Sequence, residues 1–438
     1  MGALTRGTDF RLDTDGAELF LGASIPSAAR DILHIGMAAF VVDRIQRRDG
    51  GRARDLEIEV AVENPRFWAK DATLHLVRSC LEFVTPDTWS FRFAQDSSNH
   101  SKEKFLPWPK DENPPTVCLY SGGLDSAAGL AARLNDRNGS VIPVAAWSQG
   151  AQRRAVIEQM KLLQARFGAN RSTPLIVKSH LLGVPWNEQE SSQRSRSVFF
   201  AALGCAVAVT AGASKIELYE SGVGALNLPP MAGMLVGGRS TRHCHPEFLR
   251  RMGLLASHVV GRPITYELPF VDRTKAEVVR TLKSQRLKDL AELTFSCPHY
   301  PLFRASRAHQ CGACLACIGR RQALLCAGVP DRVDYQHDLF SERANEVADS
   351  ELGFLKAALM QVDDLAPLER GEMPRILERH LFGTQVVWEG LMAAPWAELM
   401  LRYRREWLSV IEQMRTRGVQ WAKWLGHRTA ASTEPTNG

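Results

Sequence analysis

The chain has 438 residues, of which 45% are hydrophobic and 23% charged, with a formal net charge of +6 at pH 7. This length accommodates two or three domains, and the composition is that of a globular protein. No window approaches about eighteen consecutive apolar residues, which argues against a membrane span, and the N-terminus lacks the apolar core of a signal peptide. We therefore expect a cytoplasmic protein without a membrane partner. The positive charge fits an anionic ligand such as a nucleotide or a nucleic acid.

Residues 1–113 are predicted to form an α+β module. Helical spacing of apolar residues and strand-like alternation follow one another here. The predicted helices cover 28–48 and 71–84, and the predicted strands cover 55–64 and 89–95. Paired prolines and charged residues in 110–116 mark the boundary of this module.

Residues 114–285 alternate between strands and helices. The predicted strands cover 116–120, 141–147, 174–179, 215–220 and 263–270, and the predicted helices cover 125–136, 153–168, 196–212 and 273–285. This alternation predicts an α/β domain with a parallel sheet and helices on both faces. Ligands of such sheets bind at the carboxyl ends of the strands.

The rest of the chain divides into three further segments. Residues 286–330 carry a cysteine cluster, 331–426 have a helical pattern rich in tryptophan, and 427–438 have the composition of a disordered tail. We expect the tryptophans of the helical region to fill a helical core or a partner interface. These are Trp388, Trp396, Trp407, Trp421 and Trp424.

Glycines and small polar residues separate the first strand of the α/β domain from its helix. Gly122 and Gly123 let the backbone pass close to a bound phosphate, because neither has a Cβ atom. The N–H groups and dipole at the start of the helix then form an anion site. Ser121 and Ser126 can donate hydroxyl groups, and Asp125 can cap the helix or hold a metal ion bound to phosphate. The segment is neither a Walker loop nor a dinucleotide-binding fingerprint. A turn that merely needs glycine is the alternative.

The motif Ser-Gly-Gly-x-Asp-Ser resembles the signature that N-type ATP pyrophosphatases carry after their first strand. This resemblance implies a PP-loop domain of the HUP-like, adenine nucleotide alpha hydrolase-like fold. It implies that residues 121–126, Leu124 included, bind ATP with Mg²⁺ and grip pyrophosphate while a substrate oxygen attacks the α-phosphate. Trp147 and Ser148 end the second strand, where related folds hold adenine.

Cys297, Cys311, Cys314 and Cys317 cluster in one short segment. In a reducing cytoplasm such a cluster favours a metal over disulfides. Two overlapping Cys-x-x-Cys steps with a fourth cysteine upstream suit a closed, structural Zn²⁺ site. A redox Cys-x-x-Cys pair and an iron–sulfur cluster are the alternatives. The other cysteines are interpreted as ordinary buried thiols: Cys80, Cys118, Cys205, Cys244 and Cys326.

The glycine loop and the cysteine cluster together resemble the QueC family, the 7-cyano-7-deazaguanine synthases. The resemblance covers roughly 116–325, and Lys275 and Glu277 match that family's Lys-Ala-Glu. Arg196 and Ser197 stand where the family has an Arg-Asn pair. In the family, ATP adenylates the carboxylate of 7-carboxy-7-deazaguanine, ammonia gives the amide, and a second activation gives the nitrile. The resemblance thus implies a PP-loop ligase that forms a C–N bond through an acyl-adenylate.

This chain departs from the biosynthetic enzyme, which is much shorter. Residues 219–233 and 237–248 replace an Asp-rich segment of the family and, with the N-terminal region, look like the QueC-like proteins of bacterial antiphage systems, QatC and the type IV CBASS member. This likeness implies a deazaguanine-type carboxylate that is activated by ATP and passed to an amine on a partner protein from the same operon. The catalytic candidates are Asp125, Ser126 and Lys275.

Five further residues are candidate substrate contacts: Arg194, Arg196, Glu220, Asn227 and Arg242. The arginines suit a phosphate or a carboxylate, the glutamate can accept hydrogen bonds from a purine-like edge, and the asparagine lies in a loop suited to a lid. A helix start, a strand cap or a turn is the alternative role. His243 and His245 are also possible substrate contacts, but we do not predict them as zinc ligands.

Three other functions remain open on the sequence alone. Ammonia instead of a protein amine would make the chain a 7-cyano-7-deazaguanine synthase. Other enzymes of this fold modify tRNA, which the net charge permits, although no RNA-binding module is recognisable. A non-catalytic scaffold in a defence complex is the last alternative, and the intact glycine loop argues against it.

Overall fold

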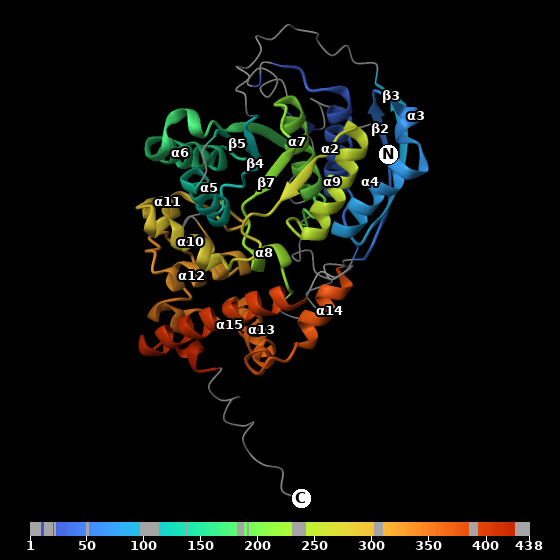
Figure 1. The fold of residues 1–438 in the computed structure, drawn as a ribbon. Helices are drawn as coiled ribbons and strands as arrows, with labels where there is room; N and C mark the ends of the chain where they lie inside the picture. The colour runs from blue at the N-terminus through green and yellow to red at the C-terminus, as the bar shows by residue number, and fades with distance from the viewer. Residues whose placement is uncertain are drawn as a thin grey trace, which may run out of the picture.

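The computed structural model describes residues 10–12, 21, 23–49, 52–96, 114–136, 139–181, 188–190, 192–229, 242–301, 310–384 and 393–424. Its centre is a six-stranded sheet with the strand order β1-β6-β5-β4-β7-β8 (Figure 1). The strands are β1 (Phe10–Leu12), β4 (Thr116–Leu119), β5 (Val141–Trp147), β6 (Leu175–Leu181), β7 (Lys215–Leu218) and β8 (Thr265–Glu267). All neighbouring pairs are parallel except β1 and β6. The predicted parallel sheet is therefore confirmed, and the antiparallel edge strand β1 is an addition to it.

Helices cover both faces of the sheet, as the alternating pattern predicts. One face carries α5 (Leu124–Asp136), α6 (Gly150–Phe167), α10 (Lys275–Ser284) and α11 (Lys288–Leu293), and the other carries α2 (Ser27–Ile45), α7 (Arg196–Thr210) and α9 (Pro246–Val260). Successive residues of β4 point into the two different cores, since Val117 packs with the α7 side and Cys118 with the α5 side. The α/β architecture is confirmed.

Helix α9 lies in a segment to which the sequence analysis assigned no element. Pro246 is the first residue of the helix, and the ring nitrogen Nδ1 of His245 accepts a hydrogen bond from the Glu247 N–H at 3.3 Å. Gly261 follows the last residue of the helix, with φ of +76°. Proline at the start and glycine just past the end are standard helix signals. The helix could therefore have been predicted from the sequence.

The N-terminal residues share their core with this sheet. The strands β2 (Asp55–Val62) and β3 (Thr88–Gln95) pair in parallel around α3 (Pro65–Trp68) and α4 (Asp71–Val84). Helix α2 packs against α7, and both contribute side chains to one continuous cluster with the sheet. This region thus covers one face of the α/β core.

A buried ion network joins α2 to the segment that opens α7. Asp43 is fully buried, and its carboxylate accepts hydrogen bonds from Arg48 at 3.1 Å, from Arg54 at 2.5 Å and from the hydroxyl of Ser195 at 2.6 Å. Arg48 and Arg54 also bond Asp87. Buried charges that lose a partner cost several kcal/mol, about 3–5, so this network holds α2 in place.

The C-terminal residues form a helical layer below the sheet in Figure 1. The helices are α12 (Leu315–Ala327), α13 (Gly353–Asp364), α14 (Arg375–Gly383) and α15 (Ala393–Thr416), and α8 (Gly222–Leu226) reaches them from the sheet. Short 3₁₀ turns connect the elements at Ala169–Arg171, Glu342–Glu346, Asp349–Leu352, Ala366–Arg370 and Gln420–Lys423.

The tryptophans of this layer differ in burial and in the core to which they belong. Trp407 and Trp421 lie in a helical core, Trp396 packs at the edge of a second one, and Trp424 is 38% exposed. Trp388 and the tail 427–438 lie outside the described residues. Among the helices that the structure describes, none is long and apolar enough to cross a membrane.

Candidate active site

The glycine turn between β4 and α5 has the geometry of an anion site. Gly122 has a φ of +77°, and a Cβ atom there would lie 2.7 Å from the ring of Phe295. Helix α5 begins with the Ala127 N–H bonded to the Gly123 carbonyl at 3.0 Å, so the N–H groups just before it have no partner within the helix. These N–H groups, together with the helix dipole, favour a phosphate at this point.

Two hydroxyl groups lie beside these N–H groups. The Oγ atoms of Ser121 and Ser126 are 2.7 Å apart, and the Gly123 N–H donates to Ser121 at 3.2 Å. Leu124 is buried in the core, so only its backbone can serve a ligand. The loop therefore presents backbone donors and two hydroxyls from one short segment.

Two carboxylates and one ammonium meet at the same edge of the sheet. The Lys275 ammonium donates to Oδ2 of Asp125 and lies 4.0 Å from Oε1 of Glu220. Lys275 is the first residue of α10, and Glu220 follows β7, the neighbour of β4. The carboxyl ends of these parallel strands bring residues together that lie far apart in the sequence.

Burial and like charge act on this group of residues. Burial and the Asp125 carboxylate raise the pKa of Glu220 to about 8, against the opposing effect of Lys275. Burial alone would lower the pKa of Lys275, but the two carboxylates outweigh it and the pKa is raised. Asp125 is 7% exposed, and its Oδ1 atom is buried with no hydrogen-bond partner. The site therefore holds a lysine that stays charged and a carboxylate oxygen able to accept a further donor or a cation.

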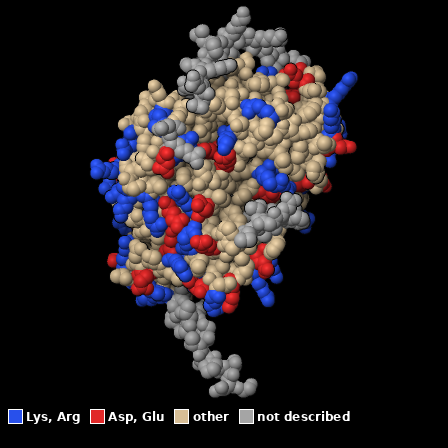
Figure 2. Space-filling view, viewed as in Figure 1, with Lys and Arg blue, Asp and Glu red and all other residues tan. Residues whose placement is uncertain are grey.

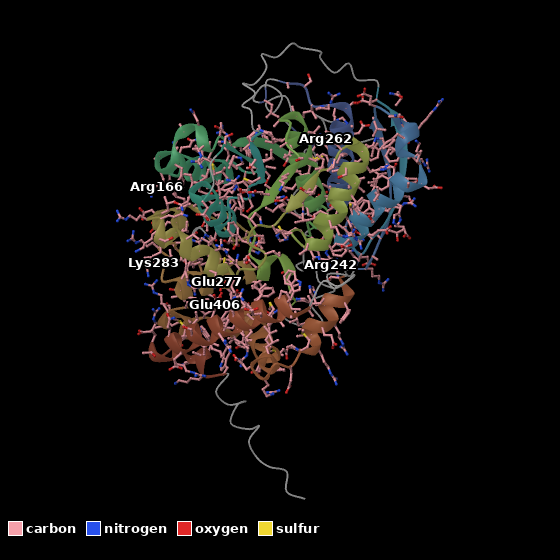
Figure 3. The ribbon with its side chains drawn as sticks, in the orientation of Figure 1. Arg166, Arg242, Arg262, Glu277, Lys283 and Glu406 are labelled. Atoms are coloured by element: carbon pink, nitrogen blue, oxygen red, sulfur yellow. The ribbon has the colours of Figure 1, made fainter. Side chains whose placement is uncertain are left out.

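The helix that carries Lys275 is held by the C-terminal layer. Thr274 and Glu277 form a capping box at the start of α10. Glu406 of α15 accepts a hydrogen bond from the Thr274 hydroxyl at 2.6 Å, and Arg402 donates to Glu277 at 3.0 Å. Figure 3 places Glu277 and Glu406 together between the two helices. The C-terminal layer thus fixes the direction from which Lys275 reaches the loop, which the sequence analysis did not predict.

Charged side chains of both signs meet on the surface above this junction. A shallow hollow there is lined by Asp272, Arg273, Glu277, Arg280 and Arg402. Figure 2 shows acidic and basic side chains side by side on this face. Their mixed signs neutralise one another, so we assign the hollow no ligand.

The four clustered cysteines converge on one point. Their Sγ atoms all lie within 4.8 Å of one another. Backbone N–H groups of Cys311, Cys314 and Cys317 donate to the sulfur atoms of Cys297, Cys311 and Cys314 at 3.4–3.5 Å. Four converging thiols fit a tetrahedral Zn²⁺ site, and N–H donors to sulfur are the second shell that such sites need. The predicted cysteine set can hold the structural zinc ion.

This cysteine site is joined directly to the glycine turn. The Phe295 N–H donates to the Gly122 carbonyl at 3.1 Å, and the Gln310 side-chain carbonyl accepts from the N–H groups of Ser296 and Cys297 at 3.0 and 3.1 Å. The side-chain amide of Gln159 also donates to the Gly122 carbonyl, at 3.1 Å. A zinc ion would therefore stabilise the segment around Phe295, which contacts the glycine turn.

Trp147 and Ser148 lie at the carboxyl end of β5, beside β4. The Trp147 ring is half-buried with the Lys178 ammonium 5.4 Å from its centre. Ser148 is exposed, and its N–H donates to the Gln152 side chain at 3.3 Å. Both predicted adenine contacts thus lie on the edge of the sheet that carries the glycine turn.

The predicted substrate arginines lie beside the N-terminal region. Arg194 is buried close to Arg48 and Arg242. Arg196 stacks over Phe200, and burial, followed by Arg44, lowers its pKa to about 10. Arg242 donates to the Phe83 carbonyl at 3.1 Å, and Figure 3 shows it near α8 and α9.

Two more of the predicted residues cap helices. Asn227 ends α8 in the left-handed conformation, with φ of 46°. His245 is fully buried, and burial, followed by His380 and nearby arginines, lowers its pKa to about 3, so it is a neutral cap of α9.

One cysteine of the supposedly ordinary set lies at the site itself. Cys244 is only half-buried, and its Sγ lies within 4.8 Å of donor atoms of Glu220 and His243. The sequence analysis interpreted Cys244 as an ordinary buried thiol. The only sequence signal against that interpretation is its position between His243 and His245.

Cys311→Ser should remove one equivalent of bound zinc and lower the free energy of unfolding by more than about 3 kcal/mol, since structural zinc contributes on the order of 10 kcal/mol in small domains. Metal analysis and urea denaturation measure both effects. Cys326→Ser is the matched control, because Cys326 lies outside the cluster. Equal zinc content in the two variants would overturn the assignment of this site.

Glu406→Gln should change how stability depends on pH. Burial raises the pKa of Glu406 from 4.5 to about 7, against hydrogen bonding by Thr274 and the charge of Arg280. The folded state keeps this proton between these two values while the unfolded chain releases it, so the unaltered chain loses stability as pH rises toward 7. We expect its free energy of unfolding to fall by about 1–3 kcal/mol relative to the variant between pH 5 and 8.

Urea denaturation at several pH values checks this expectation for Glu406. Glutamine keeps the acceptor for Thr274, so the variant tests the charge and not the contact. The control is Glu412→Gln on the exposed side of the same helix. If the free energy of unfolding changed with pH in the same way for the unaltered chain and Glu406→Gln, the prediction would be contradicted.

Comparison with known proteins shows which family part of this chain resembles. Residues 242–328 match the family described as queuosine biosynthesis protein QueC. This stretch contains Lys275 and the four clustered cysteines. It does not include the glycine turn.

Curated relatives extend the match to half of the chain. The 7-cyano-7-deazaguanine synthase of Methanothrix thermoacetophila is 27% identical over 244 residues, which cover 50% of this chain and 98% of that protein. The synthase of an Anaeromyxobacter species is 28% identical over 247 residues, covering 50% and 95%. The synthase of Porphyromonas gingivalis is 33% identical over 93 residues, covering 21% and 39%. The resemblance predicted from the motifs is confirmed to this extent: about half of this chain is homologous to 7-cyano-7-deazaguanine synthases.

Proposed function

We propose that this chain is an ATP-dependent PP-loop enzyme that adenylates the carboxylate of a 7-carboxy-7-deazaguanine-type base and passes the acyl group to an amine. The observation that carries the proposal is the meeting of two distant motifs. The Ser-Gly-Gly-x-Asp-Ser loop supplies Asp125, and the stretch that matches the QueC family supplies Lys275, whose ammonium donates to it. A turn that merely needs glycine would have no reason to place a half-buried lysine there.

The loop and Lys275 account for the first step. Backbone N–H groups at the start of α5, with the hydroxyls of Ser121 and Ser126, bind the pyrophosphate end of ATP. A carboxylate oxygen of the base attacks the α-phosphorus, the bond from that phosphorus to the bridging oxygen breaks, and pyrophosphate leaves. Lys275 stabilises the negative charge that develops on the α-phosphate.

Asp125 suits a Mg²⁺ ion that accompanies ATP. Its Oδ1 atom is buried without a hydrogen-bond partner, and carboxylate oxygens are the ligands that Mg²⁺ prefers. When bound, Mg²⁺ neutralises charge on the phosphates.

The second step forms the C–N bond. The amine nitrogen attacks the acyl carbon, the bond from that carbon to the AMP oxygen breaks, AMP leaves, and the amine gives up a proton. In this proposal Glu220 accepts hydrogen bonds from the N–H groups of the base, Arg194, Arg196 and Arg242 serve anionic groups, and Asn227 lies on the covering loop.

The protein amine and the antiphage role rest on the part of the chain outside the homologous half. About half of this chain suffices to match nearly the whole length of the synthases. Helix α15 lies outside the stretch 242–328 that matches the family, and it holds the start of α10 through Arg402 and Glu406. Large additions that contact the site support an acceptor larger than ammonia. We place this reaction in the cytoplasm, with a protein from the same operon as the acceptor.

A second candidate is the synthase reaction itself, with ammonia as the amine. The names of the homologous relatives favour it. The two candidates share the adenylation step and differ in the acceptor.

Lys275→Ala should lower adenylation by roughly 100-fold, the usual loss when one donor to a developing charge is removed. Exchange of labelled pyrophosphate into ATP, measured with 7-carboxy-7-deazaguanine present, reports this step. Lys283→Ala is the control, because Lys283 is exposed near the other end of the same helix. Retained ATP binding by the unaltered chain with no exchange would contradict adenylation of this base.

Co-expression with the neighbouring operon proteins tests the acceptor. We expect intact-mass spectrometry to show that one neighbour gains the mass of a deazaguanine acyl group, and only when the unaltered chain is present. Lys275→Ala should abolish the gain and Lys283→Ala should keep it. Nitrile formed from carboxylate, ATP and ammonia, with no mass gain on any neighbour, would favour the synthase reaction.

A further inference from the structure

A second group of metal-ligating side chains lies beside the glycine turn, apart from the four clustered cysteines. Glu220, His243 and Cys244 each offer one donor atom, and these atoms all lie within 4.8 Å of one another. Glu220 follows β7, whereas His243 and Cys244 precede α9. The fold therefore brings two separate segments to one point at the carboxyl edge of the sheet.

The backbone around Glu220 is shaped to hold its carboxylate. A Cβ atom at position 224 would lie 2.1 Å from Oε1 of Glu220, so a larger residue there would force this carboxylate out of its place. Gly224 lies in α8, whose N-terminal cap is Ser221, the residue after Glu220. The carboxylate is thus folded back over the first turn of α8 and directed to a defined place.

Asp125 adds a second carboxylate close to this group of side chains. It is 7% exposed, its Oδ2 atom pairs with Lys275, and its Oδ1 atom is buried without a partner. Asp125 lies close enough to Glu220 and Cys244 to act on both electrostatically. Two carboxylates and a thiol therefore gather around a single ammonium, and a divalent cation that bound them would displace the protons that its ligands carry.

The donor set indicates which cation fits. One sulfur, one imidazole nitrogen and one carboxylate oxygen suit Zn²⁺ and similar transition metals, whereas Mg²⁺ and Ca²⁺ prefer oxygen alone. Three protein ligands leave a fourth position open, as in catalytic zinc sites and unlike the closed four-cysteine site.

We propose that Glu220, His243 and Cys244 bind one Zn²⁺ ion, with an open fourth position at the edge of the ATP loop. The sequence analysis did not predict His243 as a zinc ligand, because a lone histidine is more often structural. The fourth position is open to water or to an oxygen or nitrogen atom of a substrate. A carboxylate has two oxygens, so Glu220 can bind the ion with one and accept a hydrogen bond from a base with the other.

Metal analysis of the purified full-length chain tests this site without any substrate. After dialysis against a zinc buffer, we expect two zinc ions per unaltered chain. His243→Ala and Cys244→Ala should each hold one ion fewer, and so should Cys311→Ser, which empties the other site. Cys326→Ala, another half-buried thiol outside both groups, should keep both ions.

His243 is exposed, so His243→Ala is not expected to disturb folding, and circular dichroism of each variant confirms this. Replacing zinc by Co²⁺ adds a spectroscopic readout, because the thiolate of Cys244 should give a charge-transfer band that Cys244→Ala removes. One zinc ion per unaltered chain, or two ions in both His243→Ala and Cys244→Ala, would overturn the proposal. Pyrophosphate exchange is measured separately, so failure of this site and failure of adenylation are distinguishable.

Discussion

The arrangement of the candidate active site depends on the ion pair between Asp125 and Lys275. It joins the start of α5 to the start of α10, at residues 150 apart in the chain. Burying these charges costs several kcal/mol per ion unless each is well partnered. Glu220, which shares the same lysine, adds a second carboxylate to the site. Such a site persists only if the elements carrying it are held firmly from outside.

Both flanking regions provide that support. Arg402 and Glu406 of α15 hold the capping box in front of Lys275, from the C-terminal side. From the N-terminal side, Asp43 binds Ser195 just before α7 begins. Helix α7 packs against β4, the strand that leads into the glycine turn. Helices α2 and α15, which both lie outside the stretch 242–328 that matches the QueC family, are therefore part of the architecture of the site, and a chain without them would expose both buried networks to water.

Whether a feature could be predicted from the sequence depends on how far apart its interacting residues lie along the chain. The glycine turn and the four cysteines are short motifs whose chemistry depends on local spacing, so both could be identified from the order of residues alone. The alternating strands and helices indicated the parallel sheet for the same reason. The contacts of Arg402 and Glu406 could not be predicted, because nothing in a helical pattern says which distant helix start it will meet. The proximity of Cys244 to Glu220 could not be predicted either, because Glu220 belongs to another segment, after β7.

The segments that follow β7 and precede α9 meet beside the glycine turn. Glu220 leads into α8, and His243 and Cys244 lead into α9, so the proposed ligands of the second zinc ion gather at the carboxyl side of β7. The glycine turn carries the Ser-Gly-Gly-x-Asp-Ser motif, and a thiol and an imidazole lie near the carboxylate of Glu220 beside it. In the proposed function the motif performs the activation step, and the side chains beside it determine which group receives the activated base.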